Sequence, residues 1–135
     1  MTRYVIDAAT LVHLVANDIA IDASHQIVAP NAIRSQALSL LLAAVQRGDL
    51  AEDRALMQHE RLTELKMRLL GDRVSRRAAW KIARERGWKT TSEAEYIAVA
   101  KLQADALVTI DGDLASKARD VVPLAPLNAL STPHD

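Results

Sequence analysis

An aspartate ends each of two short apolar runs, Tyr4-Val5-Ile6-Asp7 near the start of the chain and Ala106-Leu107-Val108-Thr109-Ile110-Asp111 near its end. Short apolar runs of this composition predict buried strands. In open parallel α/β sheets, ligands bind at the carboxyl edge, where the strands end. We therefore expect Asp7, Asp111 and the neighbouring Asp113 to meet at that edge of one sheet.

Three carboxylates at one sheet edge predict a cation site. They repel each other unless a cation neutralises them, and hard divalent ions such as Mg²⁺ prefer oxygen ligands. The alternative for each aspartate by itself is that it caps the helix that follows. For the three acids together, the prediction is a metal site.

The rest of the chain alternates strand-like and helical segments. The strands are expected over 3–6, 26–29 and 106–110, with a β-like piece over 121–124 and an ambiguous segment over 66–70. The helices are expected over 9–16, 32–47, 50–62, 73–86 and 93–103, with a short one from Leu114; Asn31, Asp72 and Thr91 or Ser92 are candidate caps. This alternation predicts an α/β fold with a mostly parallel sheet covered on both faces.

The helix over 32–47 carries apolar residues available for a buried stripe, namely Ile33, Leu38, Leu41, Leu42 and Val45. With 135 residues, half of them apolar, the chain has the size of one domain. We expect that domain over 1–130, followed by a frayed tail over 131–135.

The composition excludes several classes of protein. There is no cysteine, so disulfides and thiolate metal sites are excluded, which suits a reducing cytoplasm. No apolar run approaches the roughly 20 residues that span a bilayer, and the first residues lack a signal-peptide pattern. We expect a cytoplasmic protein without a membrane contact.

Acidic and basic side chains balance at 17 each, so a nucleic-acid partner would need a local basic patch. The segment 73–89 offers one, with four basic residues on one helical face: Arg73, Arg77, Lys81 and Arg84. This face is interpreted as an RNA-backbone track, as a groove for an acidic segment of a partner, or as a solvated surface. Aromatic residues are scarce, which does not favour base stacking, and Trp80 and Trp88 are expected to pack.

Further motifs lie between the two aspartates: Ala29-Pro30, Arg34-Ser35-Gln36-Ala37-Leu38, Leu69-Leu70-Gly71-Asp72-Arg73-Val74 and Glu93-Ala94-Glu95-Tyr96. In their order and spacing the chain resembles the PIN domain, in particular the VapC-type ribonuclease toxins of bacterial toxin–antitoxin pairs. The resemblance covers nearly the whole chain. It implies a three-layer α/β/α sandwich whose acids bind Mg²⁺ or Mn²⁺ and cleave RNA. It also implies a homodimer and a cognate antitoxin protein as partner.

The resemblance assigns roles to four acids. It implies that Asp7, Glu93 and Asp111 are catalytic and hold the metal, with Asp113 as an additional ligand. Glu93 stands where the family usually has aspartate, which moves the ligand oxygens by roughly 1 Å, a displacement that can cost about a hundredfold in rate.

Other positions are candidates for lining the site. Gln36 lies at or near the place where many members carry glutamate, so one negative charge is absent. Ala9 stands where a hydroxyl residue often follows the first aspartate, and Thr10 is a candidate substitute. Glu95 is a further candidate beside Glu93.

The chemistry that fits these residues is metal-assisted hydrolysis of a phosphodiester. The chain is accordingly expected to be a Mg²⁺- or Mn²⁺-dependent endoribonuclease and the toxin of a toxin–antitoxin pair. The alternative is a catalytically weakened PIN-like domain that binds RNA or a protein without cutting. A phosphoacceptor receiver-like domain also has acids at strand ends, but this chain lacks the adjacent acidic pair after the first strand and a lysine that ends the last one.

Overall fold

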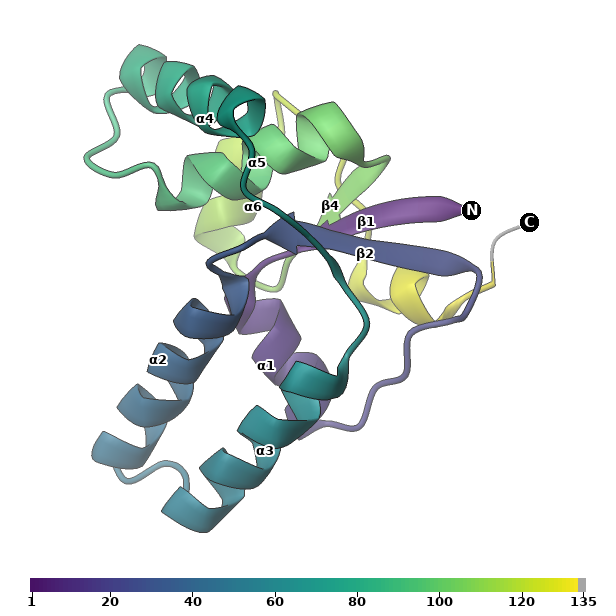
Figure 1. The fold of residues 1–135 in the computed structure, drawn as a ribbon, viewed down its shortest axis with the longest axis vertical. Helices are drawn as coiled ribbons and strands as arrows, with labels where there is room; N and C mark the ends of the chain where they lie inside the picture. The colour runs from purple at the N-terminus through teal and green to yellow at the C-terminus, as the bar shows by residue number, and fades with distance from the viewer. Residues whose placement is uncertain (134–135) are drawn as a thin grey trace.

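Four parallel strands form the central sheet of the computed structural model, which describes residues 1–133 (Figure 1). They are β1 (Thr2–Ile6), β2 (His25–Pro30), β3 (Arg68–Leu70) and β4 (Ala106–Val108), in the order β3-β2-β1-β4. The ambiguous segment over 66–70 thus contains an edge strand. Val5 of the central β1 lies opposite Val28 of β2 and Leu107 of β4.

Helices cover both faces of this sheet (Figure 1). They are α1 (Ala8–Ala16), α2 (Ile33–Gln46), α3 (Glu52–Glu64), α4 (Arg73–Arg86), α5 (Ser92–Gln103) and α6 (Gly112–Ala118), followed by a 3₁₀ helix (Leu127–Ser131). On one face α5 packs on β1, β2 and β4, and α4 packs on α5. On the other face α1 packs against α2 and α3. The predicted three-layer α/β/α sandwich is confirmed.

Aspartates begin three of these helices. Asp7 caps α1 by accepting from the Thr10 amide, and Asp72 caps α4 by accepting from the Ser75 amide at 3.2 Å. Asp111 caps α6 by accepting from the Asp113 amide at 2.9 Å. The alternative interpretation, that each strand-end aspartate caps the helix that follows, is therefore confirmed for Asp7 and Asp111. Capping leaves open what the remaining carboxylate oxygens bind.

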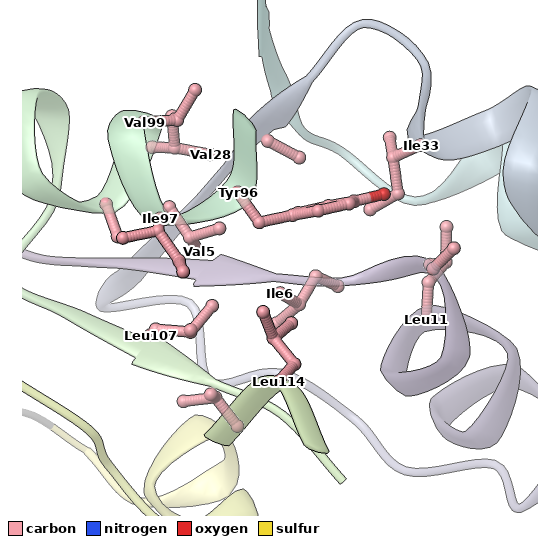
Figure 2. Packing of buried hydrophobic residues seen from close by; sticks show 14 of the residues in the cluster. Val5, Ile6, Leu11, Val28, Ile33, Tyr96, Ile97, Val99, Leu107 and Leu114 are labelled. Atoms are coloured by element: carbon pink, nitrogen blue, oxygen red, sulfur yellow. The ribbon is translucent and has the colours of Figure 1, made fainter. Parts of the chain in front are cut away.

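Aliphatic side chains fill the space between the sheet and its helices (Figure 2). Val5 and Ile6 of β1 are fully buried, as is Ile97 of α5 on one side of them. Figure 2 also shows Leu107 and Leu114, which are buried to within 2% exposure. Because β1 is an inner strand and its carboxyl end is buried at Val5 and Ile6, the residue that follows it, Asp7, is placed at the carboxyl edge inside the protein.

The predicted apolar stripe of α2 is wrong at two positions. The helix buries every fourth residue, Ile33, Ala37 and Leu41, against its neighbours. Leu38 and Leu42 are 44% and 56% exposed. These two leucines lie on an adjacent side of α2, and neither α1 nor α3 covers that side enough to bury them.

The predicted caps of α2 and α5 have different outcomes. Thr91 occupies the N-cap position of α5 as predicted, but its side chain makes no capping hydrogen bond. At α2 the N-cap position is occupied by Ala32 and not by Asn31. Asn31 instead donates its backbone N–H to the Leu70 carbonyl at 2.9 Å, and its side chain lies against Gly71. A Cβ at Gly71 would collide with that side chain, so the contact requires glycine there. Tertiary contact with the end of β3 replaces the expected cap.

The C-terminal segment differs from the prediction in two ways. The β-like piece over 121–124 makes one isolated bridge, between Leu107 and Leu124, and no strand. Leu130, the last residue of the expected domain, is fully buried. Within the expected frayed tail over 131–135, Ser131 Oγ donates to the Ala20 carbonyl at 2.8 Å, whereas residues 134 and 135 lie outside the described residues. Across residues 1–133, no helix has the length and apolar character to cross a membrane.

Candidate functional site

Asp7 is a buried carboxylate at the carboxyl end of β1, with 6% of its surface exposed. The Thr10 hydroxyl and amide both donate to Oδ1, the amide at 3.4 Å. Among the described residues, no hydrogen bond reaches Oδ2 and no cationic side chain pairs with Asp7. A buried charge without a cationic partner is costly. The open oxygen of Asp7 therefore suits a cation.

Thr10 joins the two strand ends that carry the predicted acids. Its fully buried hydroxyl donates to Asp7 and accepts from the Ile110 amide at 3.0 Å. The segment after β4 is thereby held against the start of α1. The candidate substitute for the missing hydroxyl at Ala9 thus lies in direct contact with the Asp7 carboxylate.

Gln36 reaches the same region through Tyr96. The Tyr96 hydroxyl donates to Oε1 of Gln36 and so connects α5 with α2. Figure 2 shows the Tyr96 ring between α5 and β1, with its oxygen toward Ile33 at the start of α2. Burial and the negative charge of Asp7 raise the pKa of Tyr96 well above 10.0, so its hydroxyl stays protonated. The neutral Gln36 is thereby held as a hydrogen-bond acceptor near Asp7.

Glu93 and Asp113 share one lysine. Lys117 Nζ lies 2.6 Å from Oε1 of Glu93 and 3.1 Å from Oδ2 of Asp113. The hydrogen bonds that Lys117 donates to these two carboxylates, Glu93 first, raise its pKa. Lys117 is not among the site residues predicted from the sequence. Its spacing of four residues from Asp113 on one short helix was the available signal, because side chains at i and i+4 meet.

Asp111 and Glu95 lie in other surroundings. Asp111 is exposed, and its Oδ1 accepts from the amides of the first turn of α6. Glu95 is half-buried and lines a narrow crevice with Arg76, Pro30 and Leu70, between α4, α5 and the ends of β2 and β3. Glu95 is therefore not part of the Glu93–Asp113 pair.

The predicted metal ligands fit a divalent ion in chemistry but are not gathered into one cluster. All four are carboxylates, the donors that Mg²⁺ and Mn²⁺ prefer. Within residues 1–133, however, no group of three or more acidic, histidine or cysteine side chains is close enough to hold a metal ion. The expectation that Asp7, Glu93, Asp111 and Asp113 surround one point is not met in this arrangement. In this arrangement Lys117 pairs with both Glu93 and Asp113, while Asp111 caps α6.

The basic face of α4 is exposed as expected: Arg73, Arg77, Lys81 and Arg84 all reach solvent. None of the ion pairs in the described part of the chain involves them. Trp80, which was expected to pack, is 64% exposed on this helix, so that prediction is wrong. At 100° per residue Trp80 falls between Arg76 and Arg73 on this exposed face, a signal that the sequence already contained.

Trp88 is half-buried and packs against the core as expected. Lys117 Nζ lies 5.3 Å from the centre of its ring, and Arg86 Cζ lies 5.9 Å from it. These distances allow cation–π contacts. The same lysine that pairs with Glu93 is therefore also held by an aromatic ring.

No protein-family model and no curated protein sequence matches this chain. Among solved structures it is similar to PAE2754 from Pyrobaculum aerophilum, with a TM-score of 0.73 and 23% sequence identity. The match covers 96% of this chain and 93% of that chain. At this identity the likeness shows a shared fold and nothing about activity.

Proposed function

We propose that this protein is a PIN-like, VapC-type toxin: a Mg²⁺- or Mn²⁺-dependent endoribonuclease that hydrolyses RNA phosphodiesters in the cytoplasm and is silenced by a cognate antitoxin. One observation carries the proposal most. Asp7 is a buried carboxylate at the carboxyl edge of the central strand, and no described side chain neutralises it. This is the place where ligands bind in open parallel sheets.

In this proposal each site residue has a separate role in metal binding or in orienting a ligand. Asp7 would hold the ion, while the Thr10 hydroxyl and amide fix the orientation of its carboxylate through Oδ1. Asp111, Glu93 and Asp113 would be the further ligands, and Lys117 competes with an ion for Glu93 and Asp113. A bound divalent ion would supply a water of lowered pKa and neutralise charge on the phosphate. Lys117 would contact an RNA phosphate.

The test is cleavage of a structured RNA by the purified protein in Mn²⁺, with and without EDTA. We expect EDTA to abolish cleavage and Asp7→Asn to reduce its rate by on the order of a hundredfold or more, because a misplaced or lost ligand disturbs the reacting geometry. Asp53→Asn is the matched control, since Asp53 is exposed on α3. Equal cleavage by Asp7→Asn and the unchanged protein would overturn the proposal.

A second candidate function is supported by Lys117 and Gln36. With Glu93 and Asp113 neutralised by a lysine and an amide in place of a fourth acid, the protein would bind RNA or a partner without cutting it. Calorimetry separates the two functions. RNA binding without detectable heat from millimolar Mg²⁺ or Mn²⁺ would favour this second function.

The proposed homodimer and antitoxin contacts fit the surface of α2 and α3. These helices extend side by side beyond the sheet (Figure 1) and expose five large apolar side chains: Leu38, Leu40, Leu42, Leu56 and Met57. Contiguous exposed apolar residues mark interaction surfaces. Sedimentation of the chain by itself should give a dimer, and Leu56→Glu should shift it toward the monomer.

A further inference from the structure

The exposed face of α4 combines one aromatic ring with unpaired guanidinium groups. At 100° per residue, Trp80 lies within about 60° of Arg73, Arg76, Arg77 and Arg84 around the helix. The opposite side of α4 is buried through Ser75, Ala79, Ile82 and Ala83. Trp80 is therefore held at the centre of a basic surface by a helix whose other side is anchored in the fold.

This surface is hollowed. Arg73, Arg76, Arg77 and Trp80 line an open depression at the N-terminal half of α4. Within residues 1–133 none of these arginines forms an ion pair, although the charge of Arg76 acts on nearby Asp72. The charges of Arg73 and Arg77 are therefore available to a ligand. An exposed indole ring beside three guanidinium groups is costly to leave in water and is suited to a flat, negatively charged ligand.

The depression borders the edge of the sheet at which Asp7 lies. Arg76 lines it and also lines the crevice formed with Pro30, Leu70 and Glu95. Pro30 and Leu70 are the last residues of β2 and β3. The surface therefore runs from α4 toward the carboxyl ends of the strands.

We propose that the α4 depression binds a single-stranded segment of RNA, with one base stacked on Trp80 and the flanking phosphates on Arg73, Arg76 and Arg77. This inference rests on the proposed function for the choice of RNA and adds that the bound strand is unpaired. A base inside a duplex has both faces covered by its neighbours, whereas an unpaired base offers a face to the indole. An acidic peptide would satisfy the guanidinium groups but would leave the ring exposed.

The test measures binding apart from cleavage, by fluorescence anisotropy of a labelled single-stranded RNA with the full chain in EDTA. Trp80→Ala should raise Kd roughly 5- to 150-fold, the range for loss of one stacked base. Trp80→Phe, which retains a ring, should recover most of the affinity. Arg77→Glu should weaken binding and reduce the salt slope by about 0.7 or more, because a phosphate contact is lost.

Val74→Ala is the matched control, because Val74 is on the same helix and is also 64% exposed but lies about 120° away around the axis. Unchanged binding by Trp80→Ala would overturn the inference, as would equal affinity for a duplex of the same sequence. Tighter binding of an acidic peptide, in competition with RNA, would overturn it in favour of a protein ligand. If Trp80→Ala binds normally while Asp7→Asn loses cleavage, this inference fails and the proposed function stands. If Asp7→Asn cleaves normally while Trp80→Ala loses binding, the proposed function fails by itself.

Discussion

Lys117 places its ammonium group 2.6 Å from Oε1 of Glu93, so a predicted metal ligand already has a cation from its own chain. The same group lies 3.1 Å from Asp113. A divalent ion that uses these acids must therefore displace the lysine or bind beside a like charge. In the proposed metal site, Lys117 competes with the ion for these two carboxylates.

Removal of Lys117 should strengthen metal binding. We expect Lys117→Met to tighten Mn²⁺ binding on the order of tenfold, since a positive charge next to the ion is removed. Titration calorimetry measures the change, and Lys101→Met on α5 serves as the control. Unchanged Mn²⁺ affinity in Lys117→Met would show that Glu93 and Asp113 are not ligands.

Thr10 should stabilise the folded protein through the two hydrogen bonds of its hydroxyl, and the shape of its side chain should matter less. Thr10→Val removes the donor to Asp7 and the acceptor for the Ile110 amide, and should lower the free energy of unfolding by about 1–3 kcal/mol. Thr10→Ser retains both hydrogen bonds and should lose less. Urea unfolding monitored by circular dichroism compares them, and equal losses would contradict this role.

Tyr96 should make the protein sensitive to alkaline pH. Because its pKa is raised in the folded state, the unfolded phenol loses its proton above pH 10.0 while the folded one keeps it. The free energy of unfolding should therefore fall as pH rises through this range. Tyr96→Phe should have a shallower decline than Tyr4→Phe in urea unfolding between pH 9 and 11, values about one unit either side of the usual tyrosine pKa. Parallel declines would contradict the prediction.

Leu130 should be part of the folded domain. Leu130→Ala leaves a cavity in the core and should cost about 2–5 kcal/mol in the free energy of unfolding. Leu42→Ala, at a position 56% exposed on α2, should change it by less than about 0.5 kcal/mol. Thermal unfolding measures both. A loss at Leu130 no larger than at Leu42 would place the domain boundary before residue 130.

Several features could be predicted from the sequence because they depend on neighbours in the chain. Asp72 and Gly87 mark the ends of α4 through a side-chain cap and a left-handed φ of 71°, both local properties. The apolar runs before Asp7 and Asp111 predict strands for the same reason. Pairing in parallel then follows from the helices between them.

The predicted α2 stripe and the Asn31 cap failed for the opposite reason. Periodicity shows which residues share one side of a helix. It does not show how much of that side the neighbouring helices cover, and here Leu38 and Leu42 are left exposed. Asn31 has a side chain that commonly caps helices, but here that side chain packs against Gly71, which follows β3. Both outcomes depend on packing between distant segments.

The sequence by itself determined that this chain is an α/β protein with acids at the carboxyl ends of two strands, because strand and helix signals act over a few residues. Only the tertiary structure decided the partners of Glu93 and Gln36. Lys117 meets Glu93 across 24 residues, and Tyr96 meets Gln36 across 60. Such pairs are selected by burial and charge where helices pack, and no local pattern encodes them. For this reason the aspartates at the strand ends could be predicted from the sequence, whereas the ion pair between Lys117 and Glu93 could not.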